Sequence, residues 1–425
     1  MSAFHYHQGT LHADQVALAD IAAVVGTPVY VYSATAMRAS AQAFVDAFSG
    51  ERVLFCFAVK ANSNLAVIRL FANEGLGADT VSGGEIARAL RAGVPPRRIV
   101  YAGIAKTDDE IRFALATGIL QFNVESVQEL QRIGGLAAGM GLSAPIAVRV
   151  NPDVDAGTHE KISTGRRHDK FGIPYEEAPA VYALAAGLQG VTPVGVHLHI
   201  GSQIGRLEPF EAAYRRGADL FKNLRGQGIP LRRLDLGGGF GVRYLDEPRL
   251  EAAALAKLVR RVTEGLDCEL LFEPGRALVA EAGVIVSRVI YLKEAGGRRF
   301  LVLDSGMHVL IRPAMYGAHH PVVPVREPRE DEPLAAMDVV GPICESSDVL
   351  GRDRLLPQLA AGDLVAITGA GAYGAVMGSD YNSRPSAAEV LVDGERRAVI
   401  RPSRDIEAQL AEERIPAWLE PAADG

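Results

Sequence analysis

Short apolar runs alternate with longer stretches of helix-forming composition through the first two thirds of the chain. The apolar runs, each of strand length, lie at 53–59, 76–79, 98–102, 119–124, 145–150, 194–200, 232–236 and 268–273. Ala-rich stretches that favour helix lie between them, at 84–92, 125–138, 176–188, 208–226 and 248–265. Eight strands that alternate with helices are typical of a (β/α)8 barrel. We therefore predict an α/β fold of the TIM-barrel type over residues 36–281.

The pattern changes after residue 281. Runs rich in β-branched residues follow without long helical partners, at 283–293, 299–303, 337–343, 363–368 and 387–400. The Pro-rich segment 321–333 has the composition of a loop. This pattern predicts a C-terminal all-β domain. One strand-like run near the start, 28–32, can pair with either domain, and we assign residues 1–35 and 282–425 together to a β-rich domain.

Composition and charge narrow the function. The chain has 425 residues, a net charge of −7 and 48% hydrophobic residues, which fits a globular protein with a large core. Scattered basic residues argue against nucleic acid as a partner. No apolar run reaches the roughly 18 residues of a membrane span, and the first residues lack the pattern of an export signal. Three widely spaced cysteines fit reduced thiols. We expect a cytoplasmic protein that binds neither nucleic acid nor membrane.

Lys60 ends the first apolar run and is the first candidate for chemistry. Strand alternation places its side chain on the same face as Ala58 and Cys56. If that face lines the barrel, the amine lies at the C-terminal rim, where barrel enzymes have their active sites. An unpaired ammonium there is costly, and a covalent imine avoids that cost. The alternative is a lysine that has left the strand and reached solvent.

Two loops at the ends of the last two barrel strands have the composition of a phosphate site. Gly237, Gly238 and Gly239 follow the seventh strand, and the segment 273–276 (Glu-Pro-Gly-Arg) follows the eighth. Barrels commonly bind phosphate there, because backbone N–H groups converge on the anion. A tight turn is the simpler explanation of the glycines. Glu273 is either a solvated strand end or a carboxylate that holds a heterocyclic nitrogen protonated.

His197 and His199 stand two residues apart on one strand face. Three interpretations are open: a metal pair, a hydrogen-bonded core pair, or an aromatic platform against a flat cofactor. No carboxylate or cysteine lies nearby in the sequence to complete a zinc site, and His319 and His320 offer no obvious pairing. We therefore predict no metal.

Two further motifs lie in the predicted β domain. Residues 369–374 match the dinucleotide fingerprint G-x-G-x-x-G, but the stretch 377–385 cannot form the helix that a Rossmann unit requires, so we reject that interpretation. Cys344 and Glu345 follow an apolar run and begin a polar stretch. A thiol is mostly protonated at neutral pH and can donate a proton, whereas a lone cysteine more commonly fills a core.

Together these motifs resemble those of the alanine-racemase-like class of pyridoxal-phosphate enzymes, and within that class the diaminopimelate decarboxylases. The matching segments run in order through most of the chain, at 57–62, 149–155, 170–173, 199–202, 237–239, 273–276, 312–316, 341–346 and 371–374. The resemblance implies a barrel that binds pyridoxal 5'-phosphate and a β domain that completes the site. It also implies a carboxy-lyase that converts meso-2,6-diaminopimelate to L-lysine and CO2, the last step of lysine biosynthesis.

The same resemblance gives roles to individual residues. Lys60 forms the internal aldimine with the cofactor, His199 stacks on its pyridine ring, and Glu273 pairs with its protonated nitrogen. Asp79 and Ser202 support the site. Main-chain groups of two loops hold the phosphate, aided by Tyr373; the loop residues are Gly237, Gly238, Gly239, Pro274, Gly275 and Arg276. A glutamate at the ring nitrogen favours a decarboxylase, since the racemase relatives use an arginine there.

The resemblance also implies which residues select the substrate: they bind the end of the substrate that is far from the reacting carbon. Arg276, Arg312 and Tyr316 bind the distal carboxylate of the substrate, and Glu345 binds its distal ammonium; Tyr373 also belongs to the substrate site. Two arginines suit a carboxylate through bidentate hydrogen bonds, and a buried pair of them repels a terminal ammonium.

Cys344, by the same resemblance, protonates the substrate's Cα after CO2 leaves, and it reaches the site across the interface of a homodimer with shared active sites. Two alternatives stay open. One is a related decarboxylase that acts on ornithine, arginine or carboxynorspermidine. The other is a non-catalytic carrier of pyridoxal phosphate, which would not need Cys344.

Overall fold

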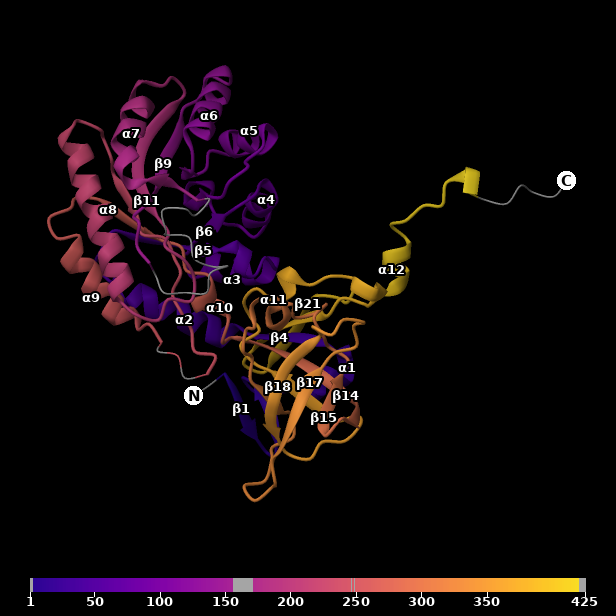
Figure 1. Ribbon diagram of the computed structural model, residues 1–425. Helices are drawn as coiled ribbons and strands as arrows, with labels where there is room; N and C mark the ends of the chain where they lie inside the picture. Colours follow the sequence, from indigo (N-terminus) through magenta and orange to yellow (C-terminus); the bar gives the residue numbers. More distant parts are fainter. Residues whose placement is uncertain (1–2, 156–170, 246, 248, 420–425) are drawn as a thin grey trace.

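Eight parallel strands close into a barrel in the computed structural model, which describes residues 3–155, 171–245, 247 and 249–419 (Figure 1). In chain order they are β5 (Val53–Ala58), β6 (Gly77–Thr80), β7 (Ile99–Tyr101), β8 (Gln121–Val124), β9 (Ala144–Asn151), β11 (Val191–Leu198), β12 (Arg233–Asp235) and β13 (Glu269–Phe272). The barrel closes because β13 pairs with β5 and β8 pairs with β9. The short β10 (Ile173–Pro174) lies beside β9. The predicted fold class is confirmed, and each predicted run coincides with one barrel strand.

Helices connect the strands and cover the outside of the barrel. They are α3 (Leu65–Asn73), α4 (Gly83–Arg91), α5 (Asp108–Thr117), α6 (Val127–Gly139), α7 (Ala178–Gly187), α8 (Glu208–Gly226) and α9 (Ala252–Val262). Before them, α2 (Ala34–Ala47) packs against α9 and the short α10 (Arg276–Val279). Local sequence sets their ends: α5 begins with a capping box between Thr107 and Glu110 and ends at Gly118, which has φ 70°. The five predicted helical stretches correspond to α4, α6, α7, α8 and α9; residues 170 and 248, named in the sequence analysis, lie outside the described residues.

A second sheet lies beside the barrel, with the order β18-β17-β15-β14-β4-β20-β21 (Figure 1). Its strands are β14 (Gly283–Ala295), β15 (Arg298–Leu303), β17 (Ala335–Val340), β18 (Val349–Leu356), β20 (Ala388–Asp393) and β21 (Arg396–Arg401). In addition, β19 (Leu364–Ile367) pairs with β14, and β16 (Val322–Pro324) pairs with β19. The N-terminal β4 (Val29–Ser33) pairs with β14 and β20. The strand-like run 28–32 therefore joins this sheet and not the barrel.

The rest of the N-terminal segment covers one face of the second sheet. It contains β1 (Phe4–His7), β2 (Thr10–Ala13), β3 (Val16–Ala17) and α1 (Leu18–Val25). Apolar residues of these elements, such as Leu18 and Ile21, share a buried cluster with Val31 and Val284 of the sheet. The hydrophobic effect therefore fixes the N-terminal segment to the sheet that β4 has entered.

Three details of this sheet differ from the prediction. β18 is missing from the predicted strands because charged residues interrupt its apolar pattern; an edge strand tolerates such residues on its solvent side. The predicted run 387–400 is a hairpin of β20 and β21 that turns at Gly394, which has φ 63°. The predicted loop 321–333 contains β16. Two short helices, α11 (Arg312–Tyr316) and α12 (Ile406–Leu410), also interrupt the β-rich part.

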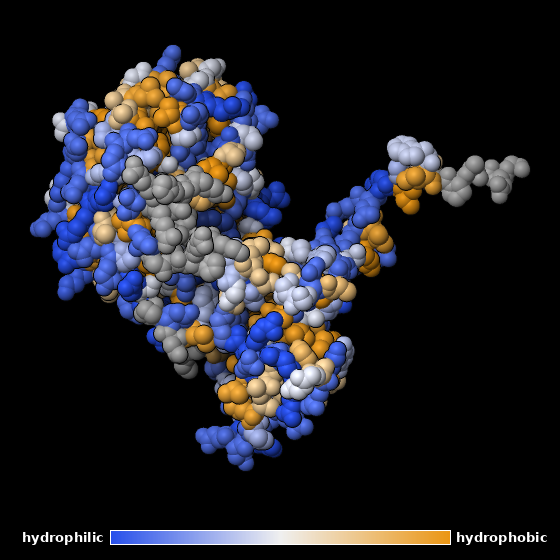
Figure 2. Space-filling model, in the orientation of Figure 1, coloured by the Kyte–Doolittle hydropathy of each residue, from blue (hydrophilic) through white to orange (hydrophobic). Residues whose placement is uncertain are grey.

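Polar and charged side chains dominate the surface in Figure 2, with apolar patches between them. After α12 the chain extends away from the body (Figure 1), and there Ile415, Trp418 and Leu419 are 75%, 83% and 68% exposed. Across the described residues, no helix has the length and apolar character needed to cross a membrane.

The side chains inside the barrel change from apolar to polar along its axis. Leu54, Cys56, Val100, Leu120 and Leu271 form a buried apolar cluster that is separate from the main core. Toward the C-terminal ends of the strands the buried residues become polar: Glu273 follows two positions after Leu271 on the same strand face, and Asn123 of β8 donates a hydrogen bond to it. Because all eight C-terminal ends meet at one rim, this polar layer lies where barrel enzymes bind their ligands.

Candidate active site

Six polar side chains form the layer that follows the apolar cluster. Each is at most 4% exposed; they are Asp79, Gln121, Asn123, His197, Asp235 and Glu273. They come from β6, β8, β11 and β12 and from the residue after β13. Burying so many polar groups is unfavourable unless they bind one another or a ligand. A layer of this kind at the rim of a barrel therefore indicates a functional site.

Lys60 lies just beyond β5, in a single 3-10 turn, Val59–Ala61. Its Nζ is 2.6 Å from Oδ2 of the buried Asp79, and its side chain is 35% exposed. Burial acts to lower the pKa of Lys60, but the nearby negative charges, Asp79 first among them, outweigh burial and raise it above its ordinary value. The lysine has left the strand, as one alternative held, yet an acid inside the barrel holds its amine at the rim.

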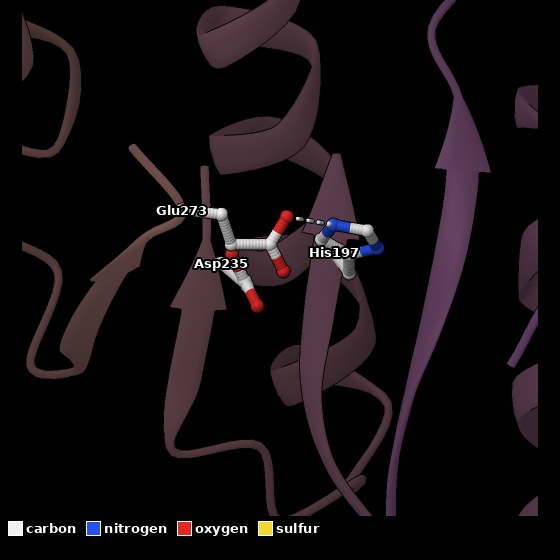
Figure 3. A group of neighbouring side chains, drawn as sticks. All are labelled: His197, Asp235 and Glu273. Carbon is white, nitrogen blue, oxygen red and sulfur yellow. Dashed lines mark hydrogen bonds and ion pairs between the residues drawn. The ribbon is translucent and has the colours of Figure 1, made fainter. Parts of the chain in front are cut away.

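Glu273 receives hydrogen bonds at both carboxylate oxygens. Nε2 of His197 donates to Oε2 at 3.3 Å (Figure 3). Nδ2 of Asn123 donates to Oε1 at 3.1 Å. Burial raises the pKa of Glu273, but the charge and hydrogen bond of His197 prevail and hold it at about 2. Burial and the charge of Glu273 raise the pKa of the neighbouring Asp235 to about 8. Glu273 therefore keeps its charge at neutral pH, whereas the charged form of Asp235 is disfavoured.

His197 in β11 and His199 just after it have different environments. His197 is fully buried and bonds Glu273, whereas His199 lies further toward the rim, where its Nδ1 accepts the backbone N–H of Gly238 at 3.4 Å. Burial and Arg149 lower the pKa of His199 well below its usual value, so its ring is neutral. The pairing of His197 with Glu273 is the core interpretation, and a neutral ring at the rim suits the platform interpretation of His199.

No carboxylate lies near His197 in the sequence, but two lie near it inside the barrel. Asp235 and Glu273 are far from His197 in the sequence, but each of the three offers a ligand atom, and these atoms lie within 4.8 Å of one another (Figure 3). Three such groups meet the spacing of a metal site. Two of the three groups already satisfy each other, since His197 donates to the charged Glu273.

The triple glycine packs tightly against its neighbours at the rim. A Cβ on Gly238 would lie 2.1 Å from the carbonyl oxygen of Glu273, and one on Gly239 would lie 2.2 Å from that of Gly201. Gly237 and Gly239 also have φ of 67° and 96°, where other residues are strained. Close packing therefore excludes side chains from this loop and leaves main-chain groups at the rim, as a phosphate site requires.

Tyr373 brings the second sheet to the same rim. Its backbone N–H donates to the carbonyl oxygen of Ala61, the residue after Lys60, at 2.8 Å. The guanidinium of Arg276 lies 4.8 Å from the centre of the Tyr373 ring, and Nη2 of Arg276 donates to Oγ of Ser202 at 3.1 Å. The fold thus brings these predicted site residues together, although they are up to about 300 positions apart in the chain.

Arg276 and Arg312 line a cavity of about 270 Å³, together with Tyr244 and Tyr316. The two arginines are only 7% and 6% exposed. Their hydrogen-bond partners among the described residues are neutral side chains. Glu247 also lines the cavity, but one of its oxygens accepts two backbone N–H groups. Two buried cations with neutral partners suit an anionic ligand.

Cys344 and Glu345 are exposed and do not line this cavity. The backbone N–H of Cys344 donates to Oδ1 of Asn382 at 3.1 Å, and Oη of Tyr381 donates to a Glu345 oxygen at 2.6 Å. All three cysteines of the chain are free thiols. A single chain therefore does not place these two predicted residues in the cavity with Arg276 and Arg312.

Sequence reasoning missed Gln121, Asn123 and Asp235 as parts of the polar layer, and Tyr244 and His320 beside the arginines. A signal for the first three was present: polar residues at alternate positions of an otherwise apolar strand face inward when the strand belongs to a barrel. Gln121 and Asn123 have that spacing, on either side of Phe122.

The arrangement at the rim fits pyridoxal phosphate. Lys60 offers an amine for its aldehyde, and the neutral ring of His199 can lie against its ring. Glu273 keeps the negative charge that its protonated ring nitrogen needs. The close-packed glycines offer main-chain groups for its phosphate. The cofactor predicted from the resemblance is thus compatible with the residues present.

Comparisons with known proteins agree with this chemistry. The family described as pyridoxal-dependent decarboxylase, pyridoxal binding domain, matches residues 34–280. The chain is 49% identical to diaminopimelate decarboxylase of Pseudomonas aeruginosa, over 98% of this chain and 99% of that protein. It is 45% identical to the enzyme of that name from Zymomonas mobilis, over 99% and 100%.

A solved structure extends the likeness to the whole fold. The crystal structure of diaminopimelate decarboxylase from M. jannaschii in co-complex with L-lysine superposes with a TM-score of 0.93, at 35% identity, over 99% of this chain and 100% of that one. The resemblance inferred from the motifs and the pyridoxal cofactor are both confirmed. The chain, over nearly its full length, belongs to the diaminopimelate decarboxylase family of pyridoxal-dependent decarboxylases.

Proposed function

We propose that the chain removes CO2 from the D-centre of meso-2,6-diaminopimelate and releases L-lysine. The observation that carries the proposal is the cavity with two buried arginines beside the rim that holds Lys60 and Glu273. It has room and charge for a second carboxylate, which distinguishes this substrate from ornithine, arginine and lysine. The relative from M. jannaschii was solved with L-lysine, the product that the proposal requires.

Substrate binding is assigned to the far wall of the cavity. Arg276, Arg312 and Tyr316 hold the distal carboxylate, because guanidinium groups bind carboxylates through paired, charge-assisted hydrogen bonds. A substrate that ends in an amine alone meets two like charges in a site with little water. The same contacts orient the other end of the substrate toward the rim.

Cofactor binding is assigned to the rim. Pyridoxal phosphate, when bound, supplies a sink for the electron pair that CO2 leaves on Cα. Lys60, beside Asp79, would bind its aldehyde end, and the ring of His199 would lie against its ring. Glu273 would hold the proton on the ring nitrogen, since it remains charged. The phosphate would meet Ser202, Tyr373 and the two loops, with Gly237, Gly238, Gly239, Pro274, Gly275 and Arg276.

The protein works, in this proposal, as a homodimer with shared active sites, in the cytoplasm. Cys344 and Glu345 are exposed on their own chain and absent from its cavity, so they are free to complete the site of a second copy. Cys344 of the partner subunit would donate the proton that replaces CO2 on Cα, and Glu345 of the partner subunit would bind the distal ammonium. The free thiols support a reducing compartment.

Mixing two inactive variants tests the shared site. Lys60→Ala and Cys344→Ala each disable one half, so a heterodimer holds one intact site and one site with both defects. An equimolar mixture that has exchanged subunits should recover about a quarter of the wild-type activity per subunit, because half of the dimers are heterodimers. The measurement is lysine release before and after exchange. Recovery must be absent for each variant alone, and no recovery in an exchanged mixture contradicts the shared site.

Arg312→Ala should raise the KM for diaminopimelate roughly a hundredfold, because a buried charge-assisted pair with the distal carboxylate is lost. Arg312→Lys is the matched variant: it keeps the charge but not the planar fork, and we expect an intermediate KM. Arg299→Ala, on an exposed side chain, is the control for a lost arginine. The measurement is initial rate against substrate concentration. An unchanged KM in Arg312→Ala would contradict the assignment.

Product analysis tests the function as a whole. Protein saturated with pyridoxal phosphate is incubated separately with meso-diaminopimelate, L-ornithine, L-arginine and L-lysine. We expect lysine and CO2 to form from diaminopimelate and no product to form from the other three amino acids. A diamine from one of the other substrates would support the related decarboxylases, and bound cofactor without any product would support a carrier.

A further inference from the structure

His320 lies directly behind Arg312 and is fully buried. Its Nδ1 is 3.0 Å from the carbonyl oxygen of Thr368, and Nε of Arg312 is 3.2 Å from its Nε2. A carbonyl oxygen only accepts, so Nδ1 carries the ring hydrogen, and Nε2 is left with the lone pair that Arg312 needs. Burial and Arg312 lower the pKa of His320 to about 3, which keeps it in this neutral form. Geometry thus fixes both the tautomer of His320 and the direction of Arg312.

Tyr244 joins the two arginines through one oxygen atom. Nη1 of Arg276 donates to Oη of Tyr244 at 2.9 Å, and Nη2 of Arg312 lies 3.5 Å from the same oxygen. The tyrosine is 8% exposed, lines the cavity, and its ring meets the ring of His320 edge to face at 5.2 Å. Guanidinium groups have no acceptor, so the hydroxyl hydrogen of Tyr244 cannot point at either arginine. It is available to the cavity.

We infer that Tyr244 and His320 determine substrate specificity: His320 positions Arg312, and Tyr244 donates its hydroxyl hydrogen to the distal carboxylate beside the two arginines. The inference deepens the proposed function and rests on it for the identity of the substrate. Both residues hold the arginines through neutral atoms. An acidic residue in either place would cancel one positive charge, whereas these acceptors leave both charges for the ligand. The ligand class is therefore a dicarboxylate whose second carboxylate lies away from the reacting centre.

Tyr244→Phe tests the hydroxyl with little risk to folding, because the ring and its contact with His320 remain. We expect the KM for diaminopimelate to rise about ten- to a hundredfold, as for a lost hydrogen bond to a charged group, with kcat changed less than about threefold. The visible absorbance of bound cofactor should not change. Tyr291→Phe, half-exposed on β14, is the control and should leave both constants unchanged. An unchanged KM in Tyr244→Phe would overturn the role of Tyr244.

His320→Leu and His320→Gln separate positioning from packing. Leucine removes the acceptor for Nε of Arg312, whereas glutamine can present an oxygen at a similar reach. We expect the KM to rise at least about tenfold in His320→Leu and to recover largely in His320→Gln, with kcat little changed. Equal defects in two folded variants would assign His320 a packing role and overturn its positioning role. If His320→Leu does not fold, His320→Gln with a wild-type KM supports the inference and a KM raised tenfold contradicts it.

A binding measurement separates this inference from the proposed function. Pimelate, the seven-carbon dicarboxylate without amino groups, is titrated into wild-type and Tyr244→Phe holoenzyme by calorimetry. If the variant binds pimelate about tenfold more weakly or worse, the inference is supported, whether or not diaminopimelate is decarboxylated. If the wild type does not decarboxylate diaminopimelate, that result contradicts the proposed function alone. Equal pimelate affinity together with normal turnover by the wild type overturns the inference alone.

Discussion

Replacing Lys60 by alanine should abolish turnover and remove the visible absorbance of the covalently held cofactor. Lys60 supplies the amine at the rim, 2.6 Å from Asp79, and in the proposed function it is the covalent partner of the cofactor. Loss of a covalent group of this kind lowers kcat by about a thousandfold or more. The measurements are lysine release from diaminopimelate and the visible spectrum of the purified variant. Activity within tenfold of the wild type would overturn the assignment of Lys60.

Two variants control this result. Lys60→Arg keeps a positive charge beside Asp79 but has no free amine, so it should be as inactive as Lys60→Ala while preserving the ion pair. Lys293→Ala, on an exposed part of β14, should retain the activity and spectrum of the wild type. Small primary amines in the medium should restore part of the rate in Lys60→Ala, where a space remains, and none in Lys60→Arg. Equal rescue of both would contradict this account.

Glu273→Gln should lower kcat by about a hundred- to a thousandfold while the cofactor stays bound. Glutamine has nearly the same shape but no charge, so nothing holds the proton on the ring nitrogen and the electron sink is weakened. Because the pKa of Glu273 is about 2, the charge that is lost is present at every pH at which activity is measured. The visible absorbance should persist, in contrast to Lys60→Ala. A full rate in Glu273→Gln would remove Glu273 from the mechanism.

Asp235→Asn is the matched control, since it alters a second buried carboxyl group in the same layer. Burial and the charge of Glu273 raise the pKa of Asp235, so an amide at this position removes less charge than an amide in place of Glu273 does. We expect kcat to fall less than about tenfold. The comparison isolates the charge of Glu273 from the disturbance of changing any acid in the barrel. Equal defects in the two variants would mean that packing of the layer, and not charge, controls the rate.

The fold was largely predictable because its determinants are local. Apolar runs of strand length alternate with amphipathic helical stretches, and this alternation is present in the sequence whether or not the chain is folded. The prediction failed where a strand depends on its place in the assembled sheet. β18 carries Arg352, Asp353 and Arg354 in its middle, a pattern that only an edge strand tolerates, and edge position is a property of the assembled sheet.

By itself the sequence determined the barrel, the β-rich part, the family and the cofactor, since these depend on periodicity and on motifs that are contiguous in the chain. Only the tertiary structure decided how the charges are shared. Asn123, His197, Asp235 and Glu273 lie on different strands, and their burial beside one another sets which acid is charged. The acceptor role of His320 likewise needs Arg312 and Thr368 at its two nitrogens. Electrostatic interaction and desolvation depend on distance in space, which spacing along the chain does not contain.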